Sequence, residues 1–207
     1  MIFSTLSVLA LVSASFAAPA PVTTDEYVRA PTGFNITSVG VIGTGCPPGT
    51  SYALVSDDNS ALTAVFSQFY AFAGPGVGIS DNRKACRLTL GVKVPEGYSF
   101  SVNTLEHAGF YQLDKGVTGS QGSYYYFQGE INEATARKAY EGPVLGKDYI
   151  NKIDFEGAAF SPCGKDTVLN FGSDVRVNNA NNKNGYGAIG TDSIQFRQTL
   201  HLSWKAC

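Results

Sequence analysis

Four cysteines behind an apolar N-terminal leader constrain this chain more than any other feature of its sequence. They are widely spaced, at Cys46, Cys86, Cys163 and Cys207. An even number of cysteines in an exported chain is typical of disulfide pairing in an extracellular protein. Because all four are expected to be oxidised, thiol-based catalysis is disfavoured.

The leader has the pattern of a secretory signal peptide. Residues 2–18 are apolar or small, and no charged side chain precedes Asp25. The apolar core at residues 6–12 is too short to span a bilayer, which needs about 20 residues. Ser15 and Ala17 have the spacing that signal peptidases favour. We therefore predict a signal peptide at residues 1–18, a flexible segment at 19–33, one folded domain at 34–207, and secretion.

Composition narrows the fold and the partners of that domain. Charged residues make up 15% of the chain and aromatic residues 12%, with 23 glycines. Few charges and many aromatic and glycine residues are typical of a β-sheet protein with tight turns. The net charge is −2, and lysines and arginines are scattered along the sequence. We therefore expect a monomer that binds neither nucleic acid nor a membrane.

Strand patterns dominate the domain. Residues 85–94 alternate apolar and polar side chains, which is the period of a half-buried strand. A turn at 95–97 and the alternating run 98–102 predict a hairpin there. Residues 133–140 suit a short helix or a strand about equally. Further strands are predicted at 38–42, 61–72, 108–113, 123–129, 149–155, 167–177 and 192–204. The sequence predicts an all-β antiparallel sandwich of jelly-roll-like type with two disulfides.

Two motifs resemble ligand sites but favour structural roles. Residues 39–49 contain a strand followed by Gly43 and Gly45, as in dinucleotide-binding folds. The third glycine comes one position late, and Pro47 and Pro48 prevent a helix from starting there. We expect a glycine turn that positions a cysteine, and no cofactor. The cluster of oxygen-bearing side chains at residues 56–60 suits Ca²⁺, but it is more typical of a turn, so we assign no metal site.

Catalytic residues cannot be assigned from the sequence. The two imidazoles are His107, interpreted as a loop residue beside a solvated carboxylate, and His201, interpreted as a surface residue. Neither belongs to a recognised nucleophile motif. A glycosidase needs only two carboxylates at a suitable separation. Four glutamates are equally plausible candidates: Glu106, Glu130, Glu141 and Glu156.

Two surface features remain open at this stage. The run from Tyr124 to Phe127 places aromatic rings on both faces of a strand, so two rings should be at least partly exposed. Such rings can stack on sugars, although cross-strand packing is the favoured interpretation. Asn35 begins the only Asn-x-Ser/Thr sequon of the chain and is a predicted glycosylation site.

An ordered set of short motifs resembles a known family of small secreted proteins from filamentous fungi, classed as a domain of unknown function. The resemblance runs from about Gly40 to Cys207. It implies secretion, four disulfide-forming cysteines and a β-rich fold, and it supplies no catalytic residues. The motifs are GTGCP at 43–47, AGPG at 73–76, DNRKAC at 81–86, PEGY at 95–98, SPCG at 161–164, and DS at 192–193 with WKAC at 204–207.

These observations support one preferred function and one alternative. Cys46 follows a predicted strand and Cys86 opens the next clear one, so we expect the sequential pairs Cys46–Cys86 and Cys163–Cys207. The preferred function is a non-enzymatic secreted protein, an effector or binding module, that acts at the fungal cell wall or a host surface. Its partner would be a cell-wall polysaccharide or a host surface component. The alternative is a secreted polysaccharide hydrolase that uses a carboxylate pair.

Overall fold

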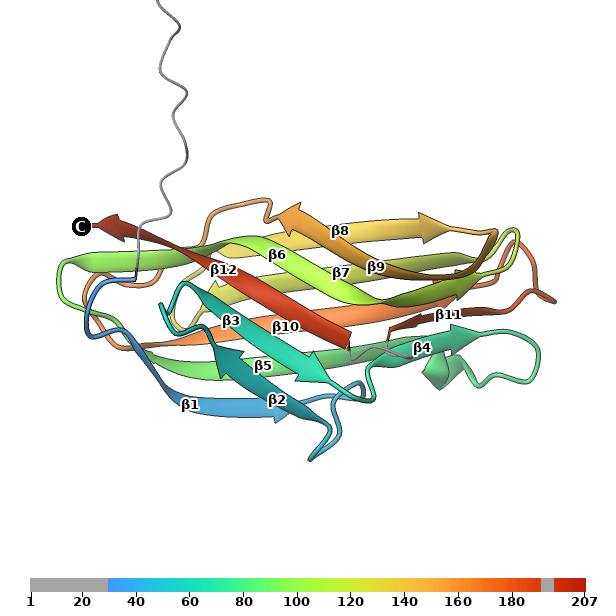
Figure 1. Cartoon of the computed structure of the whole chain (residues 1–207), viewed down its shortest axis with the longest axis horizontal. Helices are drawn as coiled ribbons and strands as arrows, with labels where there is room; N and C mark the ends of the chain where they lie inside the picture. The colour runs from blue at the N-terminus through green and yellow to red at the C-terminus, as the bar shows by residue number, and fades with distance from the viewer. Residues whose placement is uncertain (1–29, 191–195) are drawn as a thin grey trace, which may run out of the picture.

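The computed structural model describes residues 30–190 and 196–207, which form two antiparallel β-sheets that face each other (Figure 1). The five-stranded sheet has the spatial order β1 (Asn35–Ile42), β5 (Arg83–Lys93), β10 (Thr167–Asn178), β7 (Thr118–Phe127) and β8 (Glu133–Glu141). The seven-stranded sheet has the order β2 (Ser51–Val55), β3 (Ala61–Phe66), β12 (Phe196–Ala206), β6 (Tyr98–Leu113), β11 (Gly187–Gly190) and β4 (Tyr70–Ala73), with β9 (Val144–Asp154) also paired to β6. The predicted all-β sandwich with two disulfides is confirmed.

The core lies between the inner faces of the two sheets and is rich in aromatic rings. Phe100 of β6 contacts Phe127 of β7 edge-to-face, with ring centroids 5.1 Å apart. Phe34 packs edge-on against Trp204 of β12 at 4.8 Å. Each such pair contributes about 0.5–1.5 kcal/mol beyond the burial of apolar area. Rings from both sheets therefore join the two layers.

Residues 133–140 form strand β8 rather than the short helix that the sequence also allowed. Ala134 and Ala136 are buried while Thr135 and Arg137 are exposed, as expected for a strand with one face on the core. β8 pairs with β7 from Thr118 to Tyr126. The backbone hydrogen bonds to this neighbour outweigh the intrinsic helix propensity of the segment, which spans barely two turns.

The hairpin predicted around the turn at residues 95–97 is wrong. β5 pairs with β1 and β10 in one sheet, whereas β6 pairs with β12, β9 and β11 in the other. The turn therefore carries the chain from one sheet to the other. The alternating pattern correctly reports which side chains of each strand face the core, but it does not identify the strand's partner.

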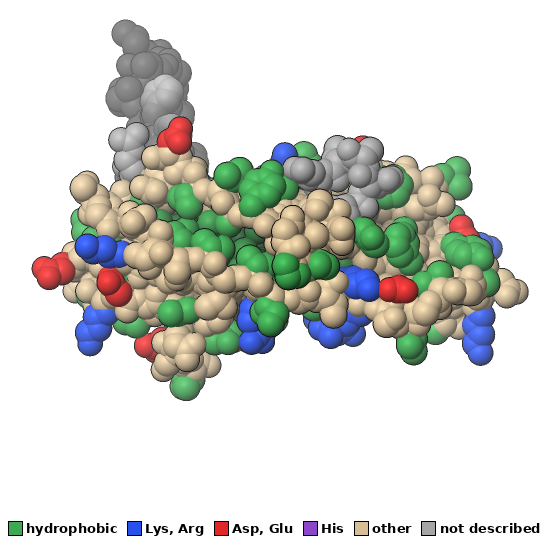
Figure 2. All heavy atoms as spheres, turned by 90° about the horizontal axis from the view of Figure 1, so that it is seen from below, with side chains coloured by type: hydrophobic (Ala, Val, Ile, Leu, Met, Phe, Trp, Pro, Cys, Tyr) green, Lys and Arg blue, Asp and Glu red, His purple; other side chains and the backbone are tan. Residues whose placement is uncertain are grey.

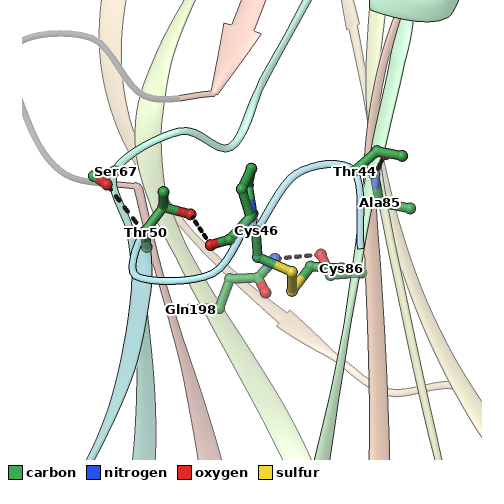
Figure 3. The surroundings of a disulfide bond; sticks show 9 residues. Thr44, Cys46, Thr50, Ser67, Ala85, Cys86 and Gln198 are labelled. Carbon is green, nitrogen blue, oxygen red and sulfur yellow. Dashed lines mark hydrogen bonds between the residues drawn. A yellow bond between two sulfur atoms is a disulfide. The ribbon is translucent and has the colours of Figure 1, made fainter. Parts of the chain in front are cut away.

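Two disulfides connect the ends of strands to neighbouring loops. Cys46 is bonded to Cys86 of β5, 40 residues later, and Cys163 is bonded to Cys207, 44 residues later. Near the first bond, the backbone N–H of Ala85 donates to Thr44 Oγ1 at 3.2 Å (Figure 3). Near the second, Cys207 N donates to Gly97 O at 2.9 Å. These are the sequential pairs expected from the sequence.

The two N-terminal segments of the predicted division lie mostly outside the described residues. The signal peptide at 1–18 and most of the flexible segment at 19–33 lie there, and both stay predictions. Within the described ranges the one helix is a 3-10 turn, Ile79–Asp81, and no helix there is long and apolar enough to cross a membrane.

Removing the second disulfide should destabilise the domain without changing its fold. In a Cys163→Ala/Cys207→Ala variant, the unfolded chain regains the freedom of a loop of 44 residues. We expect the free energy of unfolding to fall by about 3–4 kcal/mol. Urea denaturation followed by far-UV circular dichroism measures this change. An unaltered midpoint would show that the bond does not restrict the unfolded chain.

Candidate functional site

The two histidines are not positioned as exposed catalytic bases. His107 lies on β6 with 1% of its surface exposed, so its interpretation as a loop residue is wrong. The reason is that Gln198 of β12 supplies a hydrogen bond inside the core, with its Nε2 3.2 Å from His107 Nδ1. Burial lowers the pKa of His107 to about 3. His201 is half-buried on β12, and its pKa is lowered mainly by burial.

Gln198 and His107 belong to a buried polar group that connects the sheets. Gln198 Nε2 also donates to Ser173 Oγ of β10, and Ser123 Oγ of β7 donates to Ser173 Oγ at 3.3 Å. Gln198 lies beside the Cys46–Cys86 disulfide (Figure 3). In the sequence, Gln198 is the one interruption of an apolar strand face. The structure explains the interruption as an inter-sheet hydrogen-bond centre.

The acidic and hydroxylated candidates are also placed by the fold. Asp58 Oδ1 accepts hydrogen bonds from Ser56 Oγ at 2.7 Å and from the backbone and hydroxyl of Ser60 at 3.0 and 2.8 Å. Those bonds lower the pKa of Asp58 to about 2 and make the segment a turn, the structural role favoured from the sequence. Asn35 is exposed at the start of β1, and its glycosylation stays a prediction.

The four candidate glutamates are spread over the fold. They lie on four different parts of the fold: Glu106 on β6, Glu130 in the β7–β8 turn, Glu141 at the end of β8, and Glu156 after β9. Within the described ranges, no group of three His, Cys, Asp or Glu side chains is arranged to hold a metal ion.

A groove of about 690 Å³ crosses the outer face of the five-stranded sheet. Its volume is within the roughly 300–1,000 Å³ range of small-molecule sites. We call it the arginine–tyrosine groove. Residues 42–44, at the end of β1 and just after it, also line it, and its outward-facing side chains include Arg83, Arg87, Tyr124, Glu133, Thr135, Arg137 and Asp174.

Tyr124 forms an aromatic platform on the floor of this groove. The alternation of β7 buries Tyr125 and Phe127 in the core and turns Tyr124 and Tyr126 outward. The two outward rings are nearly parallel, with a 6° interplanar angle and centroids 6.4 Å apart. The Tyr124 ring covers Gly172 of β10, where a methyl group would overlap it. The absence of a side chain at Gly172 is what lets the ring lie close to the sheet.

Charged side chains surround the platform. Arg83 Nε and Nη2 donate to Asp174 Oδ2 at 3.0 and 2.7 Å, and Arg176 Nη2 approaches the same oxygen at 3.5 Å. Arg87 Nη2 donates to the Tyr124 hydroxyl at 3.0 Å, which raises the pKa of Arg87. The carboxylate and guanidinium groups therefore present both acceptors and donors along the groove.

Sequence reasoning missed these charged residues because they are scattered along the chain. Strand register brings them together: Gly172 of β10 lies opposite Arg87 on one side and Tyr124 on the other. In the neighbouring row, Asp174 and Arg137 flank Gly122. The aromatic run was the one signal that pointed to this face, although packing was the favoured interpretation. Tyr125 and Phe127 form its core face, and Tyr124 packs across the strands over Gly172 and Arg87, so cross-strand packing holds for the outward face too.

A methyl group at Gly172 should displace the aromatic platform at little cost to stability. In Gly172→Ala, the new side chain meets the outer end of the Tyr124 ring, which can rotate away. We expect changed ring chemical shifts for Tyr124 and a loss of less than about 1 kcal/mol in unfolding free energy. NMR spectra and urea denaturation measure these two effects. Unchanged ring shifts would contradict the placement of the ring over this glycine.

The buried histidine predicts a specific response to acid. The unfolded chain takes up a proton at His107 near pH 6.5, whereas the folded chain does so only near pH 3. Stability from this group is therefore complete above pH 6.5 and is lost as the pH falls toward 3. Between pH 7 and pH 4, the free energy of unfolding of the natural chain should fall, and we expect it to fall by about 3 kcal/mol less in the His107→Gln variant. Parallel pH–stability curves would contradict this account.

Three comparisons relate the chain to known proteins. The family model described as Domain of unknown function (DUF4360) matches residues 32–207. An uncharacterized secreted protein of Arthroderma benhamiae is 38% identical over 177 residues, covering 84% of this chain and 71% of that protein. Among solved structures, TmCBM61 in complex with β-1,4-galactotriose matches with a TM-score of 0.25 and 11% identity, covering 83% of this chain and 90% of that one. A similarity at this TM-score carries no argument about the groove.

Proposed function

The chain belongs to the DUF4360 family and is secreted, and from this premise we propose that it is a non-enzymatic binding module whose arginine–tyrosine groove holds a carbohydrate chain. The observation that carries this proposal is the Tyr124 ring lying over Gly172 on the groove floor. One face of a sugar ring presents C–H bonds, which pack favourably on the electron-rich face of an aromatic ring.

The polar rim of the groove supports the same ligand class. A sugar placed on Tyr124 has its hydroxyls near the guanidinium of Arg87 and the Asp174 carboxylate, which together offer donors and an acceptor. Asp174 Oδ1 has no hydrogen-bond partner within the described part of the chain. This oxygen is buried over Gly122 beside Arg137 Nη2, so a ligand meets Asp174 through the exposed part of its carboxylate. The site thus combines an apolar platform with a few directional polar groups, as binding pockets usually do.

Binding is favoured over hydrolysis by the positions of the groove's carboxylates. Asp174 lies two strands away from β8 and four residues out of register with Glu133. Strand geometry places these two positions roughly 16 Å apart. Glycosidase carboxyl groups are separated by roughly 5–9.5 Å. Asp174 is also held by Arg83, so it is placed to orient a ligand rather than to exchange protons.

The place of action follows from export and from the ligand class. A secreted protein with a surface groove can reach polysaccharide outside the cell, so we propose the fungal cell wall or a host surface as its location. The predicted glycosylation site Asn35 is exposed at the start of β1, seven residues before the groove-lining Ile42. A glycan there would extend from the far end of the edge strand.

Removing the aromatic platform should weaken carbohydrate binding. We expect Tyr124→Ala to lower affinity at least tenfold for any glycan that the natural protein binds, which corresponds to about 1.4 kcal/mol. The reason is the loss of stacking over Gly172. A glycan array identifies the ligand, and isothermal titration calorimetry with the purified protein measures the change. The array supernatants also report whether any sugar is released.

Tyr52→Ala is the matched control, since Tyr52 is an exposed tyrosine on the outer face of the other sheet. This control should retain full affinity. Loss of binding in Tyr52→Ala with none in Tyr124→Ala would move the site to the seven-stranded sheet and contradict the proposal. Release of oligosaccharides by the natural protein would favour the hydrolase alternative instead.

A further inference from the structure

We infer that the arginine–tyrosine groove selects acidic polysaccharides, holding the carboxylates of uronic acid residues with Arg87 and Arg137. This inference rests on the proposed function, because it names the kind of carbohydrate that the same groove takes. It is carried by the distribution of charge over the fold, by the pairing of the charges inside the groove, and by the position of the two arginines around the aromatic platform.

Positive charge is concentrated on the outer face of the five-stranded sheet. The whole chain has a net charge of −2 and six arginines. Four of them occupy outward-facing positions on this one sheet: Arg83, Arg87, Arg137 and Arg176. In Figure 2, several Lys and Arg side chains (blue) project from the lower side of the molecule. Although the chain has a net negative charge, most of its arginines therefore lie on one surface, and this surface attracts anions.

The acidic side chains of the groove neutralise only part of this charge. Asp174 forms its ion pairs with Arg83 and Arg176, at 2.7 and 3.5 Å. Arg87 is bonded to the neutral hydroxyl of Tyr124, and Arg137 forms no ion pair within residues 30–190 and 196–207. Arg87 therefore has no ion-pair partner in this part of the chain, and the Arg137 guanidinium lies beside Gly122 near Asp174 Oδ1 but outside ion-pair distance of it.

Glu133 does not supply the missing negative charge. It lies on β8 four residues from Arg137, which places the two positions roughly 13 Å apart along the strand. Arg137 instead lies over Gly122, with Nη2 3.3 Å from the point that a side-chain carbon would occupy there. The Tyr124 ring covers Gly172 and the Arg137 guanidinium lies over Gly122, so an extended ligand chain in the groove lies on these side chains rather than on the bare backbone.

The two arginines flank the platform from opposite sides. Arg87 is on β5 and Arg137 is on β8, three strands away, so their positions are roughly 16 Å apart. Arg87 is held at the hydroxyl end of the Tyr124 ring. A sugar stacked on this ring places its exocyclic substituent beside a guanidinium. The planar fork of arginine matches a carboxylate with two parallel hydrogen bonds, which are stronger than bonds to a neutral hydroxyl.

One polymer prepared in two forms provides a direct test. Polygalacturonate with free carboxylates and the same polymer with its carboxylates methyl-esterified have the same sugar backbone and differ in charge. We expect the natural protein to bind the free form at least tenfold more tightly in calorimetric titrations at low salt. Raising the ionic strength should reduce this preference, because screening weakens the ion pairs.

Matched variants distinguish the contribution of the arginines to affinity from that of the Tyr124 ring. Arg87→Gln and Arg137→Gln should each lower affinity for the free form several-fold and leave the affinity for the esterified form unchanged. Arg197→Gln is the control, since it removes the same charge from the outer face of the other sheet and should change neither affinity. Tyr124→Ala should weaken binding to both forms.

The outcomes distinguish this inference from the proposed function. Equal affinity for both polymer forms, lost in Tyr124→Ala, would overturn the preference for acid and leave carbohydrate binding in place. Binding of neutral glycans alone would also overturn the preference for acid and leave carbohydrate binding in place. Equally tight binding of dextran sulfate would indicate simple ion exchange and overturn the selection of carboxylates. No binding to either polymer form or to any glycan on an array would overturn the proposed function itself.

Discussion

Every second side chain of β7 must enter the space between the sheets, and the others must face outward. Much of the molecule depends on this constraint. The inward set, which includes Tyr125 and Phe127, packs against rings of the opposite sheet and of the segment after β9. The outward set places Tyr124 and Tyr126 in parallel on the surface. A shift of one residue in register would exchange the core rings with the platform rings, so the core and the groove are specified together.

The groove also depends on what the neighbouring strands leave out. β10 places Gly172 under the aromatic platform, and β7 places Gly122 in the next row. Glycine in a central strand weakens a sheet because it packs no side chain. At Gly172 the Tyr124 ring occupies the space that a side chain would fill, and two disulfides tie strand ends to neighbouring loops. The sandwich is thus a rigid support for a surface that is locally less stable than an ideal sheet but is shaped to receive a ligand.

The fold class could be predicted because the alternation of side chains along a strand is a local pattern. The strand partners could not be predicted, because pairing joins residues that are far apart in the sequence. The period-two pattern of residues 85–94 identified a strand, yet the partner of that strand lies far away in the chain. His107 appeared solvated because its buried partner, Gln198, is 91 residues distant. The arginines of the groove appeared scattered for the same reason, since only strand register brings Arg87 and Arg137 onto one face. The exposure of two of the four rings at residues 124–127 was predicted, because it needs only the strand period, but the sequence did not say which two.

NMR chemical-shift mapping tests the central claim most directly, because it locates the bound ligand on the fold. The natural protein, labelled with ¹⁵N, is titrated with an oligogalacturonate that has free carboxylates. The account predicts that the perturbed resonances cluster on the outer faces of β5, β10, β7 and β8, around Tyr124, Arg87 and Arg137. Perturbations on the outer face of β2, β3 and β9, or none at saturating ligand, would contradict it.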